Sequence, residues 1–281
     1  MEPLKLRVGI AKASDRPLVA RLCRRAVGRS DYVFRILPTI LRRGGLFLAW
    51  NGDILVGMTN FDESIDGSGW LGMARTDPEW QGRGVATFLQ RKIAAHAKRR
   101  GIKTLRLLVT SQNRPSLRTC QRGGFTQICE ATQISSNLRG FDRHRRPMPY
   151  SLFEGQLSNL LKSRYVAKTR GYIGYGWHFI KLTEDLLIRL RDEGNIYTNG
   201  QEILLVSRPD TLFQTPRSSL TILDGGVARS LTAGKEIARG LGARVLSAYI
   251  PYDPYEISVA RRLRFRRTPW AKHCLVFEKS V

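Results

Sequence analysis

The hydrophobic and polar positions of residues 6–136 predict an alternation of strands and helices. Leu6–Ile10 alternates as a strand does, and Ser14-Asp15 then supplies an N-cap for a helix. Asn51-Gly52, the strongest short hairpin signal, joins two apolar runs. The remaining predicted elements are a strand at 70–74, a helix that opens at Gly84, a strand at 105–109 and a short helix at 116–122. This order predicts an α+β fold with a mixed, mostly antiparallel sheet flanked by helices.

The second half of the chain repeats this pattern. The segment Leu190–Val206 is similar to Leu41–Val56 at an offset of about 149 residues. The segment Val259–Phe265 is similar to Thr119–Phe125 at an offset of about 140 residues. The repeat predicts two tandem domains, at 1–148 and 149–281. The second copy has lost about nine residues where the first carries a glycine-bearing turn. Chance similarity between short strand-turn-strand segments is the alternative.

Two further segments have a distinctive composition. Arg143–Pro149 is a basic run with two prolines, which predicts a linker between the copies; a nucleic-acid contact is the alternative. Gly171–Trp177 alternates glycine with aromatic residues. This favours a strand between the domains with aromatic packing, and a substrate cage is the second interpretation.

The charge of the 281-residue chain is strongly positive, with 47 basic against 23 acidic residues and a net charge of +24. Of the basic residues 36 are arginine, which suits contacts with phosphate. An anionic partner such as nucleic acid or a ribosome is one interpretation, and a solvated basic surface is the other. The basic residues are spread along the chain, which weakens the nucleic-acid interpretation.

Other compositional features exclude several classes of protein. No apolar run approaches the roughly 18 residues of a membrane span, and the first residues lack a signal-peptide pattern, so we expect a cytoplasmic protein without a membrane partner. The four cysteines and four histidines are scattered. Their spacing argues against a metal site or a disulfide framework.

The segment Asp77–Ala86 carries the clearest chemical signal. It joins a strand to a helix through Gln81-Gly82-Arg83-Gly84-Val85-Ala86, and the first N–H groups of a helix form a seat for phosphate. A Walker A loop would need Gly-Lys-Ser/Thr here, and a dinucleotide fingerprint would need a third glycine at Thr87. Neither is present, and the remaining pattern is that of an acyl-CoA-binding turn.

The residues around this turn resemble the GNAT superfamily of N-acetyltransferases. The resemblance runs from the first strand to about Ser136 and rests on the Asp-Pro-Glu lead-in, the Gln81–Ala86 turn, Asn113, Ser116 and the ending Gly124-Phe125. It implies that acetyl-CoA is the co-substrate and that no metal is needed. The residues that it implies for cofactor binding are Ala74, Arg75 and Thr76, through backbone groups; Gln81 and the N–H groups of Gly82, Arg83, Gly84, Val85 and Ala86, in the turn; and Asn113, with Ser116 beside it.

The resemblance also implies direct attack of a neutral amine on the thioester. A base must take the proton of the amine, because its pKa lies near ~10.4, and an N–H near residues 75–76 would stabilise the oxyanion. Asp62, Glu63 and Asp66 are candidate bases, as is Glu79 in the turn, although such carboxylates are usually solvated. Many members have a tyrosine as general acid where this chain has Cys120, which is either an acid or a packing residue.

These observations predict an acyl-CoA-dependent N-acetyltransferase that acts on an amine acceptor, plausibly a protein N-terminus or lysine. The alternative is a non-catalytic acyl-CoA-binding or nucleic-acid-binding protein that keeps the fold. The second copy has Asp253 where the first has Asn113, and Ala260 where the first has Cys120. A carboxylate would repel a pyrophosphate, so we expect no cofactor in the second copy.

Overall fold

The computed structural model describes residues 5–138, 151–153, 155, 157–212 and 215–281. Its chain forms two compact units that are not continuous in sequence. Unit 1 consists of Met1–Leu108, Asn113–Thr126 and Phe277–Val281, and unit 2 of Val109–Gln112 and Gln127–Val276. The predicted boundary at 148–149 and the predicted linker at 143–149 lie outside the described residues.

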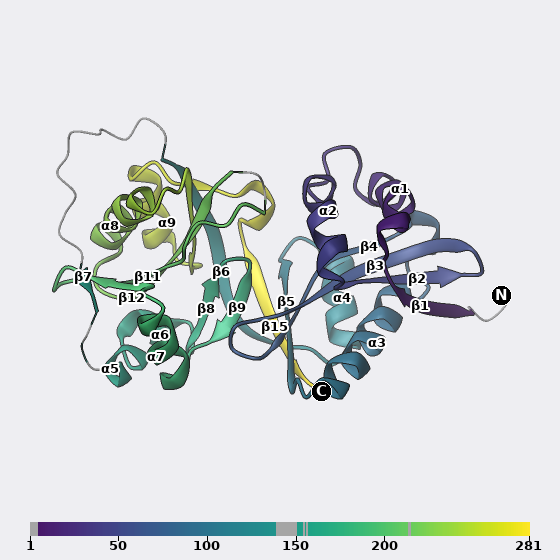
Figure 1. The fold of residues 1–281 in the computed structure, drawn as a ribbon, viewed down its shortest axis with the longest axis horizontal. Coiled ribbons are helices and arrows are strands. Elements are labelled where there is room, and N and C mark those ends of the chain that lie inside the picture. Colours follow the sequence, from purple (N-terminus) through teal and green to yellow (C-terminus); the bar gives the residue numbers. More distant parts are fainter. Residues whose placement is uncertain (1–4, 139–150, 154, 156, 213–214) are drawn as a thin grey trace. The chain divides into compact units, whose positions relative to one another are not determined.

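Unit 1 is built on a mixed sheet with the strand order β1-β2-β3-β4-β5-β15, in which β4 and β5 are parallel and β1 to β4 antiparallel (Figure 1). Its elements are β1 (Leu6–Ile10), α1 (Arg16–Ala26), α2 (Val33–Arg43), β2 (Leu46–Asn51), β3 (Ile54–Glu63), β4 (Gly69–Thr76), α3 (Val85–Arg99), β5 (Thr104–Thr110), α4 (Arg114–Arg122) and the end of β15 (Cys274–Ser280). The helices α1 and α2 lie on one face of this sheet, and α3 and α4 on the other.

One helix of unit 1, α2, is absent from the predicted pattern. It contains Pro38, which normally ends or kinks a helix. The apolar side chains of α2 nevertheless repeat at helical spacing, and Val33, Ile36, Leu37 and Ile40 are all buried. Burial of this face therefore outweighs the cost of the proline.

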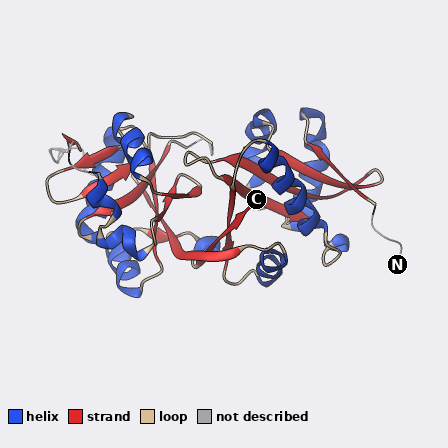
Figure 2. Ribbon diagram, turned by 90° about the horizontal axis from the view of Figure 1, so that it is seen from below, coloured by secondary structure: helices blue, strands red, loops and turns tan. Residues whose placement is uncertain are grey.

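Unit 2 also has strands flanked by helices (Figure 2). Its described strands have the order β6-β13-β12-β11-β10-β7, and of these pairs only β12 and β13 are parallel. Its elements are β6 (Thr126–Asn137), β7 (Ser151–Leu152), α5 (Ser158–Leu161), α6 (Arg164–Lys168), β8 (Tyr172–Tyr175), β9 (His178–Lys181), α7 (Glu184–Asp192), β10 (Ile196–Thr198), β11 (Ile203–Val206), β12 (Arg217–Asp224), α8 (Val227–Gly240), β13 (Val245–Pro251), α9 (Pro254–Arg262) and β14 (Arg266–Arg267). The chain is thus α+β, with mixed, mostly antiparallel sheets flanked by helices.

The glycine-aromatic segment 171–177 lies within unit 2 and does not connect the units. Its strands β8 and β9 pair only with each other, antiparallel, with Tyr172 opposite Lys181 and Tyr175 opposite His178. Gly176 takes a positive φ of 61° at the turn between them. The segment therefore forms a β-hairpin, where the alternation predicted a single strand between domains.

The elements of the two units follow the same order around their parallel strand pairs. In unit 1, β4, α3, β5 and α4 follow one another, and in unit 2, β12, α8, β13 and α9 do so. The connection from β4 to α3 spans residues 77–84, whereas that from β12 to α8 is only Gly225-Gly226. The connection after β4 is therefore six residues longer than the connection after β12.

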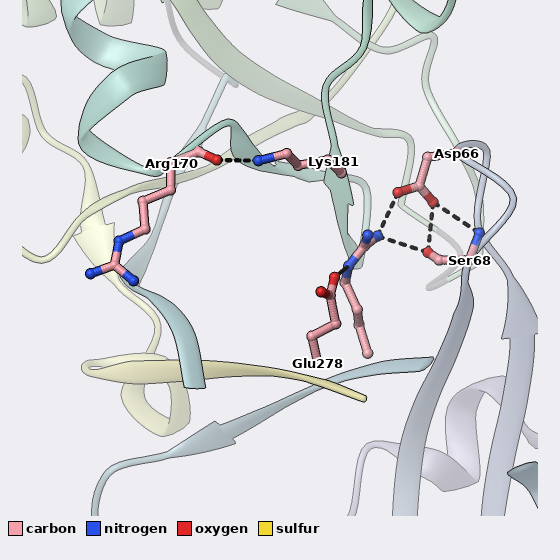
Figure 3. A network of polar contacts seen from close by, with 6 residues as sticks. Asp66, Ser68, Arg170, Lys181 and Glu278 are labelled. Carbon is pink, nitrogen blue, oxygen red and sulfur yellow. Dashed lines mark hydrogen bonds and ion pairs between the residues drawn. The ribbon is translucent and has the colours of Figure 1, made fainter. Parts of the chain in front are cut away.

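The last strand of the chain belongs in part to unit 1. Glu278 on β15 accepts from Arg106 Nε of β5 at 2.7 Å, and Arg106 is only 5% exposed. Arg106 Nη1 also donates to Asp66 Oδ2 at 2.5 Å and to Ser68 Oγ at 2.8 Å, and Figure 3 shows Asp66, Ser68 and Glu278 around this network. These contacts hold residues 277–281 against the sheet of unit 1.

Candidate functional site

The parallel strands β4 and β5 pair over a short distance only. Their ladder consists of Gly69–Leu105, Trp70–Arg106 and Leu71–Leu107, whereas β4 continues to Thr76 and β5 to Thr110. Past Leu71, the described residues of the two strands form no further pairs with each other. Beyond the ladder, Ala74 O accepts from Arg75 Nη1 at 2.9 Å, and backbone groups of β4 that have no such partner could pair with a ligand that runs along the strand.

A β-bulge in β4 begins where this ladder ends. Asn60 of β3 pairs with Gly72, but Met58 pairs with Arg75, so Met73 and Ala74 together stand opposite one residue of β3. Met73 has a φ of +53°, which non-glycine residues adopt at a cost. The bulge turns the backbone groups of 73–74 away from the ladder, and bulges of this kind concentrate beside active sites.

The turn after β4 has the backbone conformation that a phosphate-binding site requires. Gly82 and Gly84 have φ angles of 76° and 85°, and no atom lies within 4 Å of the position that a Cβ would take at either residue. Gly84 is the N-cap of α3, and no side chain caps this helix. The exposed N–H groups at the start of α3 are therefore open to an anion.

Contacts from α1 and from the turn itself hold this segment in place. Arg25 of α1 pairs with Asp77 at 2.6 Å and with Glu79 at 2.8 Å. The Gln81 side chain donates to Thr76 O at 3.4 Å, and the Arg83 guanidinium lies over the Trp80 ring. Glu79 is therefore engaged in an ion pair, which argues against its use as a base.

The side chain of Arg75 has a structural role that the sequence did not reveal. Its Nε and Nη2 each donate to a carboxylate oxygen of Asp31 at 2.8 Å, and the Asp31 side chain is fully buried. Tyr32 lies against the guanidinium. This bidentate pair joins the bulged strand to the start of α2, so the predicted cofactor contact of Arg75 is left to its backbone.

Asn113 and Ser116 lie where β5 leads into α4. The Asn113 side chain is the N-cap of α4 and accepts from Ser116 N at 3.2 Å. Both residues are thus brought together, as predicted, and Asn113 is exposed. The helix begins at Arg114, two residues before the predicted start, because Asn113 caps it and Pro115 fits its first turn.

Cys120 lies on the buried face of α4. Its side chain is 2% exposed, and burial raises the pKa of its thiol to about 12. Ala260 occupies the corresponding place on α9 and is 1% exposed. Two small buried residues at equivalent helix positions favour the packing interpretation of Cys120, because a thiol with so high a pKa is a poor proton donor.

The three acidic residues near the end of β3 have different environments. Glu63 is exposed and pairs with Arg100 at 2.7 Å, and Asp66 is held by the buried Arg106. Asp62 is partly buried and has no ion pair among the described residues; it accepts from Asn60 Nδ2 at 2.6 Å. Burial raises the pKa of Asp62, although Arg43 and the bond from Asn60 oppose the shift. Of the three, Asp62 has the properties of a base.

In unit 2, the β8–β9 hairpin covers the corresponding pair of parallel strands, β12 and β13. The ladder between β12 and β13 ends at Leu220–Ala248. Beyond it, Thr221 Oγ1 donates to Gly174 O at 2.7 Å, and Gly174 packs directly against the Tyr249 side chain. The β8–β9 hairpin therefore lies against both strands at the point where they part.

The helix start in unit 2 is surrounded by carboxylates. Asp224 Oδ1 accepts from Gly225 N at 2.9 Å, and the buried Glu202 pairs with Arg229 at 2.5 Å. Asp253 caps α9, accepting from the N–H groups of Tyr255 and Glu256. Asp253 thus has the capping role that Asn113 has in unit 1, but it brings a negative charge.

Two general features of the described residues bear on the class of protein. No group of three or more His, Cys, Asp and Glu side chains is arranged to hold a metal ion in this part of the chain. None of its helices combines the length and the apolar character needed to cross a membrane.

Comparison with known proteins identifies the family of a large part of unit 1. Residues 20–125, which contain the bulged strand, the turn and α4, match the Acetyltransferase (GNAT) family. Residues 20–125 are a GNAT domain. A mycothiol acetyltransferase of Geodermatophilus obscurus is 33% identical over 89 residues, which are 30% of this chain and 29% of that protein. The chain therefore spans less than a third of that relative.

Solved structures resemble the chain over its whole length. A protein of Thermoplasma acidophilum provisionally described as an acetyltransferase has a TM-score of 0.59 at 17% identity, covering 98% of this chain and 100% of its own. A GCN5-related N-acetyltransferase of Sphaerobacter thermophilus has a TM-score of 0.58 at 13% identity, covering 100% and 97%. At such identities these likenesses show the fold alone. The fold that they share with this chain covers both of its units.

Proposed function

We propose that the protein is an N-acetyltransferase that moves an acetyl group from acetyl-CoA to an amine, with one active site per chain in the GNAT domain. The observation that carries this proposal is the open, uncapped start of α3 directly after the bulged and partly unpaired strand β4. The residues fit the co-substrate, because two positive-φ glycines leave the backbone of the turn accessible.

Backbone groups carry the binding of acetyl-CoA in this proposal. The N–H groups of Gly82, Arg83, Gly84, Val85 and Ala86 hold the pyrophosphate, with the Arg83 charge at the rim. The free edge of β4 from the bulge to Thr76 pairs with the pantetheine arm. Asn113 and Ser116 flank the co-substrate at the start of α4.

The chain's own contribution to chemistry is to orient the reactants and to take up a proton. Acetyl-CoA supplies an activated acetyl thioester. The amine nitrogen forms a bond to the acetyl carbon while the carbon–sulfur bond breaks, the electron pair leaves with sulfur, and Asp62 receives the proton that the amine loses. An N–H of the 73–76 segment stabilises the charge that develops on the thioester oxygen. The thiolate leaves without a protein acid, so Cys120 needs no role beyond packing.

The environment of Asp62 supports its assignment as the base. Its strand partner is Trp70, and its hydrogen-bond donor Asn60 pairs with Gly72, the first residue of β4 beyond the ladder with β5. Asn60 is 2% exposed, and its Oδ1 has no hydrogen-bond partner among the described residues. Such buried acceptors are rare. An amine at this place would supply the missing donor.

The decisive experiment compares the two ends of α3. Gly84→Leu should weaken acetyl-CoA binding, measured by calorimetry, by about 100-fold or more, because a side chain in the seat removes several hydrogen bonds to a charged group. Gly101→Leu is the matched control, since Gly101 ends the same helix with a φ of 77° in equally open space. Equal affinities in the two variants would place the pyrophosphate elsewhere.

The acceptor in this proposal is the amine of a protein, at its N-terminus or at a lysine. The net charge of +24 would repel polyamines and suits an acceptor presented by an anionic assembly such as a ribosome or a nucleic-acid complex. Thiol release from acetyl-CoA, measured over a panel of peptides and amines, tests this. Tight acetyl-CoA binding with no turnover on any acceptor would support the alternative, a non-catalytic acyl-CoA-binding protein. A steep salt dependence of RNA or DNA binding would point to a nucleic-acid-binding role.

We also infer that residues 149–281 are a diverged second copy of the GNAT domain. The shared order of elements, the matching caps Asn113 and Asp253, and the shortened turn support this inference. The hairpin against β12 and β13 and the carboxylates near α8 argue that this copy binds no CoA. It serves to complete the fold or to shape the acceptor site.

A further inference from the structure

Unit 2 contains a cavity that the proposed acetyl transfer does not use. Its volume is about 350 Å³, within the size range of small-molecule sites. Its walls come from three segments: the start of β6 at Gln127–Glu130, the end of α6 with Lys168 and Arg170, and the junction of β13 and α9 at Pro251–Asp253. All three belong to unit 2.

Most charged groups of this cavity already have partners. Lys168 Nζ pairs with Glu256 at 2.7 Å and with Asp253 at 3.5 Å, and Glu130 pairs with His273 at 2.8 Å. The exception is Arg170. Among the described residues its exposed guanidinium has no ion pair or hydrogen bond, so the cavity offers one unused positive charge.

The backbone of Arg170 is held in an unfavourable conformation. Its φ is +55°, a value that glycine or asparagine adopts more easily than arginine. Lys181 Nζ donates to its carbonyl oxygen at 2.5 Å, and Figure 3 shows that the guanidinium of Arg170 extends to the side opposite this bond. The positive φ belongs to the end of α6, where Gly171 N donates to Val166 O, and it directs a side chain with an unused charge to the cavity.

The Tyr252 side chain forms an aromatic wall of the same cavity. The Tyr252 ring is stacked on the His273 ring with centroids 3.8 Å apart and planes 15° apart, and Glu130 fixes His273 in turn. Ile128 and Pro251 add apolar surface. The Arg267 guanidinium lies 5.7 Å from the centroid of the Tyr252 ring, so the cavity combines an aromatic wall held by His273 and Arg267 with the guanidinium of Arg170, which is unpaired among the described residues.

We propose that this cavity binds a small monocarboxylate with a flat apolar body. Arg170 pairs with the carboxylate through two parallel hydrogen bonds, and the apolar body lies against Tyr252, Ile128 and Pro251. A monoanion is favoured over a phosphate because Asp253 and Glu130 line the same space, so a second negative charge on the ligand would be repelled.

The test uses the full-length chain and benzoate as the probe, with benzamide as its neutral counterpart and inorganic phosphate as the dianion. Benzoate should bind, and its binding should perturb NMR signals of Tyr252. Benzamide and phosphate should bind at least about tenfold more weakly, because each loses a charge-assisted bidentate pair or meets repulsion. Benzamide binding as tightly as benzoate, phosphate binding more tightly, or no benzoate binding at millimolar concentration would overturn the proposal.

Three variants separate a binding role from a structural one. Arg170→Gln should lower benzoate affinity by about tenfold or more, whereas Arg164→Gln, at an exposed position at the start of α6, the helix that precedes Arg170, should leave it unchanged. Arg170→Gly removes the guanidinium and also the backbone strain, so it should lose benzoate binding while the melting temperature stays equal or rises. Wild-type affinity in Arg170→Gln, or in Arg170→Gly, would show that Arg170 is not the anchor. Acetyl-CoA affinity should be the same in all three.

Discussion

The turns that follow β4 and β12 differ in length and in their surroundings, although neither of the helices that follow has a side-chain cap. In unit 1 the turn is eight residues long, from 77 to 84, and presents two positive-φ glycines and an uncapped helix to solvent. In unit 2 two glycines make the same connection, carboxylates surround it, and a hairpin lies against the parting strands. We propose that the shorter loop and the hairpin leave unit 2 without a cofactor site, whereas the turn of unit 1 holds acetyl-CoA.

The difference between the units extends to acid–base chemistry. Unit 1 carries the partly buried Asp62 near the end of β3, opposite Trp70 of β4, whereas Asp210, which follows β11 in unit 2 and pairs with Arg217 of β12, is exposed. We therefore propose an acyl-donor site and a base for unit 1 only. The predictions below test whether each part of this contrast has the consequence assigned to it.

The largest expected effect concerns Asp62. Asp62→Asn should lower kcat by about 100- to 10,000-fold, as loss of a general base does, with acetyl-CoA affinity unchanged. Because burial raises the pKa of Asp62 and the base acts when deprotonated, wild-type activity should be full at high pH and fall as pH drops through a value above the ordinary one. Steady-state kinetics against pH measure both effects.

Glu63→Gln is the matched control for this change. Glu63 is the next residue on β3, but it is exposed and paired with Arg100. Its loss should change kcat by less than about threefold, since exposed pairs contribute little. If Glu63→Gln were the damaging variant and Asp62→Asn the mild one, the base would have to be reassigned.

A smaller effect is expected at the hairpin of unit 2. A Cβ at Gly174 would come within 2.4 Å of the Tyr249 ring, so Gly174→Ala should destabilise the protein by about 1–3 kcal/mol in denaturant unfolding. Gly9→Ala, in a strand with open space around it, is the control. Equal stability of the two variants would mean that the hairpin is not packed tightly against β13.

The smallest effect is expected at the short turn. Gly226 has an ordinary φ of −84° and space for a side chain, so Gly226→Leu should leave the protein folded. Calorimetry should find one acetyl-CoA per chain before and after this change, with affinity within about twofold. Two sites in the wild-type protein, of which one disappears in the variant, would show that unit 2 binds acetyl-CoA after all.

Much of the fold of unit 1 follows from local signals in the sequence. The Asn51-Gly52 hairpin, the helix that opens at Gly84 and the helix that Asn113 caps were predictable because turn and cap residues act on their immediate neighbours. The helix α2 was not, since the proline within it is a strong local signal that long-range burial overrides.

The features of the site that escaped prediction depend on contacts between distant segments. The bulge at Met73 arises from the register of two strands, and the Arg75–Asp31 pair joins residues 44 positions apart. Asp62 and Glu63 differ in their burial, and the sequence of two adjacent acidic residues does not show which of them is buried. The predicted turn residues have the predicted geometry, and their contacts with acetyl-CoA remain a prediction.

The position of the last strand, β15, has a consequence for the order in which unit 1 is completed during synthesis. The strand that carries Glu278 reaches Arg106 in unit 1, although residues 277–281 are synthesised after the whole of unit 2. Until then the GNAT domain on the ribosome has a buried arginine that lacks one of its carboxylates and a β5 edge without its last neighbour. Vectorial synthesis therefore leaves the sheet of unit 1 without these contacts until unit 2 has been synthesised.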